Sequence, residues 1–292
     1  MTILVTGAGG QVGHELALRG AGRVTALDRA RLDIADHAAI AAAIAEHRAA
    51  VLVNAAAYTA VDKAESEAEA AYAINRDAVG AMARACRQAG IPLLHLSTDY
   101  VFDGGKAGPY VETDTPNPSG VYGRSKLEGE EALRAELPEH LILRVSWVFG
   151  AHGNNFVRTM LRLGSQRPGL RVVADQAGAP THAGAIADTL LALAARHQAG
   201  QALPWGTYHY TGAPVSSWHA FAVEIFRQAR ELGLLEREPA VHAITTADYP
   251  TPARRPANSA LDNSLARARL GLASPDWRAG LREVLTTWKN EA

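Results

Sequence analysis

The chain has 292 residues, of which 48% are hydrophobic and 20% charged, and its formal net charge is -1. This length suffices for one large domain or two smaller ones, and the absence of a basic surplus argues against sequence-independent binding to nucleic acid or to an anionic membrane. The single cysteine, Cys86, cannot form an internal disulfide, and neither a signal-peptide pattern nor a long apolar run is present, so we predict a cytoplasmic protein.

The first two-thirds of the sequence alternates short apolar runs with longer amphipathic segments. We predict strands over residues 2–7, 23–28, 50–56, 92–98 and 140–147, and helices over 11–20, 36–48, 66–90 and 122–136. Val, Leu and Ile dominate the strands, as is typical of buried parallel strands, and the helices have apolar residues spaced by three and four. This alternation predicts an α/β fold with a Rossmann-type, doubly wound parallel sheet.

A glycine-rich segment directly follows the first predicted strand. Gly7, Gly10 and Gly13 have the spacing G-x-x-G-x-x-G and open the first helix. Such a turn lets the backbone approach a pyrophosphate, whose charge then rests on the helix N-terminus. Asp28 ends the second strand, where a ribose hydroxyl would be bound. Because the neighbouring Arg29 suits a 2'-phosphate, both NADH and NADPH remain open as cofactors.

The alternation of predicted strands and helices is interrupted at two places later in the chain. Residues 100–120 form a long segment rich in proline and glycine, which is typical of a functional loop. After Trp147 the alternation becomes irregular. We therefore predict a dinucleotide-binding domain over 1–146, joined by a returning helix around 182–199. A smaller, mixed α/β substrate-binding lobe is predicted from 147–181 and 200–292.

The segment VYGRSKLEGE places Tyr122 four residues before Lys126. On a helix the two side chains share one face, and such pairs often only cover surface. The chain has only four lysines, and wherever it needs a solvated positive charge it nearly always uses arginine. About 0.1 Tyr-x-x-x-Lys matches are expected by chance, so the motif favours a catalytic pair without deciding the matter.

Several longer motifs make the assignment more specific. The glycine spacing together with Tyr122 and Lys126 resembles the extended short-chain dehydrogenase/reductases. VNAAAYTAVDKAE, LSTDYVFDG, NPSGVYGRSKLEGE, SWVFGAHGNNF, DQAGAPT and YPTPARRPANS resemble the dTDP-4-dehydrorhamnose reductase family. The resemblance implies that NADPH or NADH reduces the C4 keto group of dTDP-4-dehydro-L-rhamnose, a nucleotide-sugar substrate.

The resemblance assigns three residues to the chemistry. Tyr122 would donate the proton that the developing alkoxide needs, and Thr98 would polarise the same carbonyl oxygen. Lys126 would lower the pKa of Tyr122 through its positive charge and also bind the nicotinamide ribose. Without the Tyr122 and Lys126 pair, Thr98 would be interpreted as a residue that caps a turn.

The remaining assignments also come from the resemblance. The cofactor positions, besides Gly7, Gly10, Gly13 and Asp28, are Gln11, Val12, Asp33, Ile34, Ala57, Tyr58 and Thr59. The substrate positions, besides Thr98, are Asp99, Trp147, Asn155 and Arg255, with Asn154 and Arg254 beside them. Core packing is an equally good interpretation of Trp147, and the segment PARRP is also consistent with an exposed basic loop.

Other functions remain as alternatives. Tyr100 occupies the position where related dehydratases typically have a glutamate, which favours a reductase. Reduction of another nucleotide-4-ketosugar and a non-catalytic, regulatory subunit of the same fold stay open. His95 is interpreted as a packed core residue rather than a metal ligand. The resemblance implies Mg²⁺ as a further cofactor, for which the sequence shows no complete carboxylate set, and the chain is expected to be a monomer or homodimer.

Overall fold

A large parallel sheet forms the centre of the first part of the molecule. The computed structural model describes residues 2–291, and within them the sheet has six strands in the order β10-β5-β4-β3-β1-β2. These are β1 (Thr2–Thr6), β2 (Val24–Leu27), β3 (Ala49–Asn54), β4 (Leu93–Thr98), β5 (His140–Val145) and β10 (Gly206–His209). The five strands predicted from the sequence are confirmed. The order reverses between β1 and β3, and such a switch point is where open α/β sheets bind ligands.

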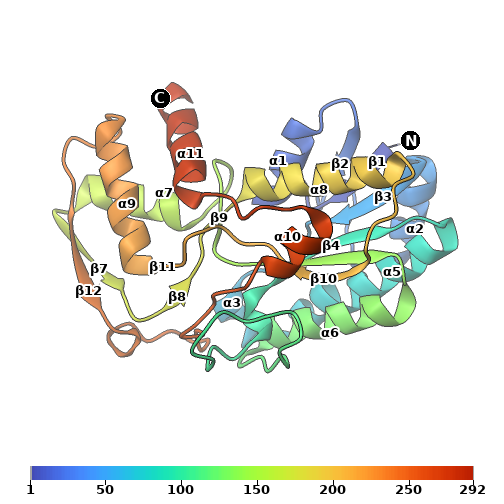
Figure 1. Cartoon of the computed structure of the whole chain (residues 1–292), viewed down its shortest axis with the longest axis horizontal. Coiled ribbons are helices and arrows are strands. Elements are labelled where there is room, and N and C mark those ends of the chain that lie inside the picture. Colours follow the sequence, from blue (N-terminus) through green and yellow to red (C-terminus); the bar gives the residue numbers. More distant parts are fainter. Residues whose placement is uncertain (1, 292) are drawn as a thin grey trace.

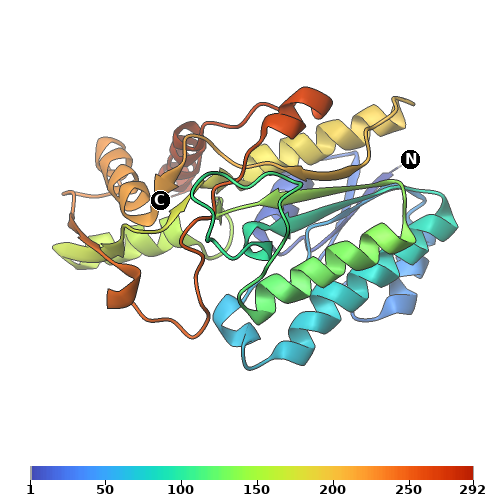
Figure 2. The same ribbon diagram turned by 60° about the horizontal axis from the view of Figure 1, so that its bottom comes forward.

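Helices cover both faces of this sheet (Figures 1 and 2). One face is covered by α1 (Gln11–Arg19) and α8 (Ala183–Gln198), and the other by α2 (His37–Glu46), α5 (Ala78–Ala89) and α6 (Val121–Glu136). Alternate residues of a strand point to opposite faces. Ile3 and Val5 accordingly pack with α1 and α8, while Leu4 packs with the other layer.

The helix predicted over residues 66–90 is interrupted. It consists of α4 (Ala68–Tyr72), a π-helical turn (Ala73–Asp77) and α5, and the short α3 (Val61–Ala64) precedes it. Within the turn, the Asn75 side chain accepts a hydrogen bond from Tyr58 N (2.9 Å) and donates to Ser125 Oγ (3.0 Å). A π turn adds a residue to the helix and re-aims its side chains. The interruption therefore ties the loop after β3 to α6.

The smaller lobe is built from short strands and helices on the left of Figure 1. β6 (Val148–Phe149) pairs with β9 (Thr181–His182), β7 (Gly169–Val173) with β12 (Ala240–Ile244), and β8 (Ala177–Gly178) with β11 (Ser216–Ser217). The helices are α7 (Phe156–Gln166), α9 (Trp218–Glu231) and α11 (Trp277–Glu291), together with the 3₁₀ turn Thr246–Asp248. Their shared core includes Phe149, Phe221, Phe226 and Trp277. The mixed α/β character of the lobe agrees with the prediction.

The chain returns to the large sheet more often than the sequence indicated. The returning helix predicted around 182–199 is α8 (Ala183–Gln198). One correction concerns β10, which lies in the range assigned to the smaller lobe but pairs in parallel with β5 of the large sheet. The short α10 (Ser264–Leu270) then packs against the same core as β10. β5 would otherwise expose an edge of unpaired backbone groups, which β10 covers.

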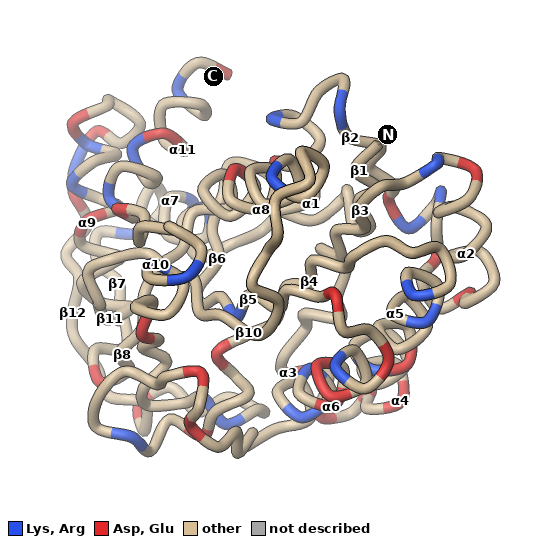
Figure 3. The backbone as a smooth tube through the Cα atoms, turned by 45° about the vertical axis from the view of Figure 1, so that its right-hand side comes forward, with Lys and Arg blue, Asp and Glu red and all other residues tan. Residues whose placement is uncertain are grey.

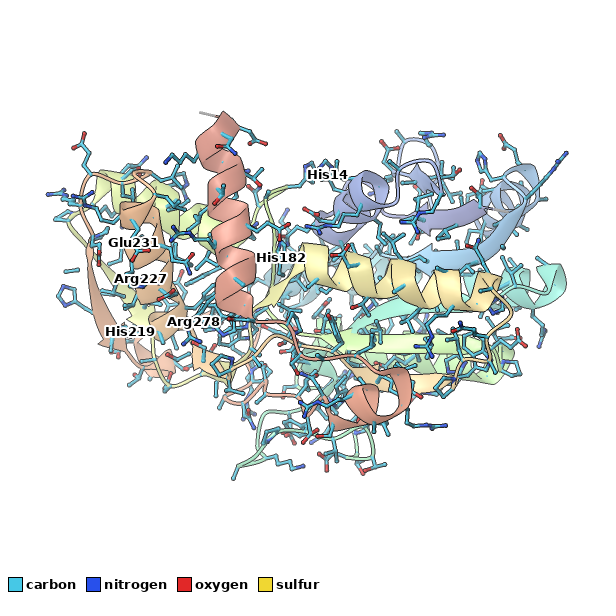
Figure 4. All side chains as sticks on the ribbon, turned by 45° about the horizontal axis from the view of Figure 1, so that its top comes forward. His14, His182, His219, Arg227, Glu231 and Arg278 are labelled. Carbon is cyan, nitrogen blue, oxygen red and sulfur yellow. The ribbon has the colours of Figure 1, made fainter. Side chains whose placement is uncertain are left out.

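The surface carries both signs of charge. Figure 3 shows basic and acidic residues interspersed along α6 and α9. On α9, Arg227 contacts Glu224 at 2.6 Å and also pairs with Glu231 (Figure 4). Within residues 2–291, no helix is both long and apolar enough to serve as a membrane span.

Candidate active site

The glycine loop has the backbone geometry that a pyrophosphate site requires. Gly7 has a φ of 81°, and a Cβ there would lie 2.6 Å from the backbone nitrogen of Ala56. A Cβ on Gly13 would lie 2.0 Å from Gly7 O. Only glycine fits these two positions, so the loop between β1 and α1 stays tight against β3. The N-terminus of α1 then faces the space above the sheet, where its backbone N–H groups suit an anion.

A cavity of about 550 Å³ extends from this loop across the carboxyl ends of the strands. Its lining includes eleven of the residues predicted for the cofactor or the chemistry: Gly7, Gly10, Gln11, Val12, Asp33, Ile34, Ala57, Tyr58, Thr59, Tyr122 and Lys126. These residues come from several separate segments of the chain. The structure therefore brings the glycine loop, Tyr122 and Lys126 into one cavity, which suits a dinucleotide.

Two predicted cofactor residues lie outside the cavity lining. Gly13 contacts the glycine loop itself, so its role is to allow close packing of α1. The Asp28 carboxylate accepts a hydrogen bond from Arg31 N (3.0 Å) within its own turn. Arg29 does line the cavity, and its side chain is 84% exposed, with only a 3.5 Å contact to Asp33. A guanidinium with spare donors at this end of the cavity suits a phosphate.

Tyr122 meets the end of β4 at the start of α6. A hydrogen bond joins its side chain to that of Thr98, which lowers the pKa of Tyr122, but burial raises that pKa by more. The nearby charge of Asp99 raises it further. The ring of Tyr100 packs edge-on against that of Tyr122 at 5.4 Å. In this arrangement Tyr122 is held as a neutral phenol that can donate a proton.

Lys126 lies beneath Tyr122, and its interactions differ from those expected. It is 2% exposed, and its Nζ donates to Leu96 O at 2.7 Å and lies 3.3 Å from His95 Nε2. Burial lowers the pKa of Lys126 to about 8, although the charge of Glu130 raises it. The predicted lowering of the Tyr122 pKa by Lys126 is not found, since burial raises the pKa of Tyr122 and Lys126 is not among the groups that shift it.

Asp99 is a buried carboxyl group in the 3₁₀ turn Asp99–Val101 that follows β4. Burial raises its pKa to about 6, while hydrogen bonds with Ser259 and Thr98 lower it. The Thr98 hydroxyl donates to Asp99 Oδ1 at 3.0 Å. Thr98 and Asp99 do not line the 550 Å³ cavity but lie next to its Tyr122 end. Asp99 therefore fixes the orientation of the Thr98 hydroxyl beside Tyr122.

A second cavity, of about 830 Å³, lies between the loop after β4 and the loop after β12. Arg254, Arg255 and Tyr249 line one side of it and Asn117 the other. Arg255 pairs with Asp62 of α3 at 2.7 Å and hydrogen-bonds to Tyr100. The lining also includes Asp103 and Asp175, and through Tyr100 the cavity adjoins Tyr122. The PARRP segment is therefore folded back toward the site rather than left as a free loop.

The other two predicted substrate residues have structural contacts in the smaller lobe. Trp147 stacks on Trp218 with ring centroids 3.7 Å apart and lies against Gly178, where a Cβ would approach its ring to 2.4 Å. Its φ of 47° is rare for a bulky residue. The Asn155 side chain accepts from Arg158 N (3.1 Å) to cap α7 and donates to Gln11 Oε1 (3.0 Å). Trp147 is thus half-buried and held by Trp218 outside the buried core, and Asn155 joins the lobe to the glycine loop.

No metal centre is found in the part of the chain that the structure describes, because no group of three or more His, Cys, Asp or Glu side chains could hold an ion. Three carboxylates do converge near α1, but the Arg19 guanidinium lies among them. It contacts Glu15 at 2.7 Å, Asp188 at 2.9 Å and Glu283. His182 lies beside Glu283 between α8 and α11 (Figure 4). In this arrangement the carboxylates do not form a Mg²⁺ site, because the Arg19 guanidinium already hydrogen-bonds to each of them.

One functional contact was missed at the sequence level. His95 is fully buried, as predicted, but it also contacts Lys126 and Asn54. The two-residue alternation of side chains along β4 could have indicated this contact. In β4, Leu93, His95 and Ser97 alternate onto one face, and Leu93 packs in the core that includes Leu133 of α6. A polar residue on that face was therefore placed to meet a polar residue of α6.

Comparisons with known proteins cover nearly the whole chain. Residues 1–290 match the family model described as the RmlD substrate binding domain. A dTDP-4-dehydrorhamnose reductase of Aggregatibacter actinomycetemcomitans is 47% identical over 286 residues, covering 97% of each chain. The crystal structure of a dTDP-4-dehydrorhamnose reductase from Clostridium acetobutylicum ATCC 824 is 37% identical, with a TM-score of 0.91 over 99% of this chain and 100% of that one. The enzyme from Bacillus anthracis str. Ames, in complex with NADP, is 33% identical, with a TM-score of 0.89 over 98% of this chain and 100% of that one.

Proposed function

Since the chain belongs to the RmlD family of dTDP-4-dehydrorhamnose reductases, we propose that it reduces the C4 keto group of dTDP-4-dehydro-L-rhamnose to give dTDP-L-rhamnose. The observation that carries this proposal is the meeting of Tyr122, Thr98 and Lys126 at one end of the cavity that begins at the glycine loop. A site for hydride transfer to a ketone needs these elements together. Neither a hydrolase nor a binding-only protein requires them.

The bound nicotinamide cofactor supplies the hydride to C4. Tyr122 gives its phenolic proton to the oxygen at which negative charge develops, and the Thr98 hydroxyl hydrogen-bonds to the same group. Without substrate, that hydroxyl donates its single proton to Asp99 Oδ1 at 3.0 Å, so it must turn from Asp99 to the substrate oxygen during the reaction. Lys126 binds the ribose end of the cofactor and forms the floor of the site. The glycine loop and the N-terminus of α1 hold the pyrophosphate.

The nucleotide-sugar is proposed to occupy the second cavity. Arg254 and Arg255 line it, and guanidinium groups bind diphosphates through paired hydrogen bonds. Arg255 is held by Asp62 at 2.7 Å, so one of its donor faces is already fixed. Arg255 contacts Tyr100, and Tyr100 packs against Tyr122. The part of the cavity proposed to bind the diphosphate therefore lies near Tyr122.

Both NADPH and NADH are proposed as hydride donors, and Arg29 supports the use of NADPH because its exposed guanidinium lines the cavity. The cytoplasmic location and the monomeric or homodimeric state remain predictions. Any requirement for Mg²⁺ also lacks support among the described residues.

The test is a substrate assay with purified protein, dTDP-4-dehydro-L-rhamnose and either NADPH or NADH, followed by coenzyme absorbance. We expect turnover in the wild type and a loss of kcat of about 100-fold or more in Tyr122→Phe, since a positioned acid contributes at least that much. Coenzyme oxidation no faster than in Tyr122→Phe would overturn the proposal. Parallel assays with UDP- and GDP-linked 4-ketosugars test the alternative of a different nucleotide-sugar. Cofactor binding without any turnover would instead support a regulatory protein.

A further inference from the structure

A buried chain of hydrogen bonds leads from β1 to the catalytic lysine. Thr6 Oγ1 donates to Asn54 Oδ1 at 2.7 Å, Asn54 Nδ2 lies 3.0 Å from His95 Nδ1, and His95 Nε2 lies 3.3 Å from Lys126 Nζ. All four residues are at most 2% exposed. Buried polar groups of this kind must satisfy one another, because no bulk water reaches them.

The orientation of the Asn54 amide is fixed by the backbone. Ala56 N lies 3.0 Å from Asn54 Oδ1, and a backbone N–H can only donate. The atom that receives this hydrogen bond is therefore the amide oxygen, and the Thr6 hydroxyl donates to the same oxygen. The NH₂ group of Asn54 must consequently face His95.

This orientation selects the tautomer of His95. The Asn54 NH₂ group can only donate, so His95 Nδ1 must accept and carries no proton. Burial, the largest cause, holds the pKa of His95 well below its usual value, so the ring is neutral. A neutral imidazole carries one proton, which must then be on Nε2. The N–H group of His95 therefore points at Lys126.

An ammonium group has three donors and no acceptor, so a protonated Lys126 would place N–H against N–H at this contact. A neutral amine accepts from His95 Nε2 with its lone pair and still donates to Leu96 O. We propose that His95, in the tautomer that Asn54 selects, is a positioning residue that biases Lys126 toward its neutral amine form. The bias makes Lys126 able to exchange a proton readily during the reduction, and this role rests on the function proposed above.

The other charged groups around Lys126 act in the opposite direction or are neutralised. Glu130, one turn further along α6, raises the pKa of Lys126. Its carboxylate is already paired with Arg144 of β5 and Arg134 of α6, each at 2.6 Å. Tyr122, on the other side, is neutral because its pKa is raised. Among these neighbours of Lys126, His95 is therefore the one whose tautomer decides whether it donates a hydrogen bond to Nζ or accepts one from it.

Two nuclear magnetic resonance measurements on the full-length protein test the proposal directly. In protein labelled with ¹⁵N-histidine, we expect the His95 signals of the Nε2–H tautomer. The four lysines of the chain make ¹³Cε-lysine titration simple to read, with Lys126 assigned by its loss in Lys126→Met. We expect Lys126 to titrate near pH 8, the pKa that burial gives it. Detection of the Nδ1–H tautomer in the wild type would overturn the proposal, and so would titration of Lys126 at the ordinary value for lysine.

The substitution Asn54→Asp should select the other tautomer of His95, with almost no change in the shape of the side chain at position 54. A carboxylate accepts at both oxygens, so His95 Nδ1 must become the donor and Nε2 the acceptor of a Lys126 hydrogen bond. We expect the tautomer to switch and the titration of Lys126 to move up by about 1 pH unit or more. His95→Gln serves as an uncharged second variant, because its amide can turn its oxygen toward Lys126, and we expect the same upward direction. An unchanged Lys126 titration in both variants would overturn the proposal.

Thr6→Val is the matched control. It removes the hydroxyl that donates to Asn54 Oδ1 but leaves the Ala56 N–H, which alone fixes the amide. We expect the tautomer and the Lys126 titration to stay as in the wild type. In the substrate assay, we expect the apparent pKa that Lys126 contributes to the pH dependence of kcat to be higher in Asn54→Asp than in the wild type. The KM for the nucleotide-sugar should stay within about twofold. Because the resonance measurements need no turnover, they remain decisive even if the proposed reaction is not observed.

Discussion

At the scale of single residues, Lys126 is the position at which we expect a substitution to be tolerated least. Its Nζ is buried and bound to Leu96 O and His95. Arginine is larger and cannot lose its proton in a protein. We predict that Lys126→Arg lowers kcat by about 100-fold or more, the contribution of a positioned proton-transfer group. Steady-state kinetics measure this loss, and the far-ultraviolet circular dichroism of the variant should match that of the wild type.

Lys289→Arg is the control for this prediction, because Lys289 is exposed on α11, outside the cavity lining. It should retain wild-type kcat. If Lys126→Arg were equally silent, the amine of Lys126 would have no part in the chemistry, and the assignment of the active site would be wrong.

Motifs at the residue scale predicted the groups that meet in the cavity but not what each one contacts. The spacing of Gly7 and Gly10 and the pair Tyr122 and Lys126 identified positions that do line it. The expected effect of Lys126 on Tyr122 was not found, because desolvation depends on tertiary packing that spacing does not reveal. His95 was correctly placed in the core, yet its polar partners lie 31 and 41 residues away in sequence.

At the scale of elements, the approach of α6 to the turn after β4 sets the distance between Tyr122 and Thr98. A Cβ on Gly123 would lie 2.1 Å from Tyr100 O. We predict that Gly123→Ala pushes α6 away from this turn, lowers the free energy of unfolding by about 1–3 kcal/mol and lowers kcat by at least about tenfold. Urea unfolding and the substrate assay measure the two effects.

Gly108→Ala is the matched control, since a Cβ there meets nothing within 4 Å. It should change neither quantity appreciably. Wild-type kcat in a well-folded Gly123→Ala protein would show that the spacing between α6 and the turn is not critical.

Regular elements of the large sheet were predictable because hydrophobic periodicity reports burial on a sheet face or helix stripe. The interruption of the helix over 66–90 was not, since alanine-rich sequence favours a continuous helix and the π turn is held by the long-range contacts of Asn75. β10 was also not predicted from the sequence, because it too depends on contacts with a distant segment. Its four residues, Gly206–His209, are too short for a clear period, and its position depends on the open edge of β5.

At the scale of the whole molecule, buried histidines couple stability to pH. Burial and the charge of Arg144 lower the pKa of His209 to about 3, and that of His95 is also well below its usual value. An unfolded histidine titrates near 6.5, so between these pKa values the unfolded state binds more protons. Stability must therefore fall as the pH drops below about 6.5.

We predict that the free energy of unfolding is lower at pH 5 than at pH 7 by about 2–4 kcal/mol. The raised pKa of Asp99, about 6, acts in the opposite direction, because its folded form gains a proton in this range. Glu130, whose pKa is lowered, loses its stabilising charge only at lower pH. Urea unfolding at the two pH values measures the difference. His209→Gln should reduce it by about 2 kcal/mol, and an unaltered difference in that variant would contradict the assignment.

The path of the chain between the two parts of the molecule bears on how its specificity can be changed. The chain leaves the large sheet after β5, returns at α8, leaves again after β10, and comes back once more at α10 before it ends in α11. The smaller lobe is thus an interwoven set of segments rather than a module at one end of the gene. A chimera with a relative's lobe would need matched joints at each crossing, and the crossing after β5 lies next to the cavity residues Val145 and Val148. Directed evolution toward another sugar nucleotide is therefore better aimed at single side chains, such as Arg254 and Tyr249, than at exchange of the lobe.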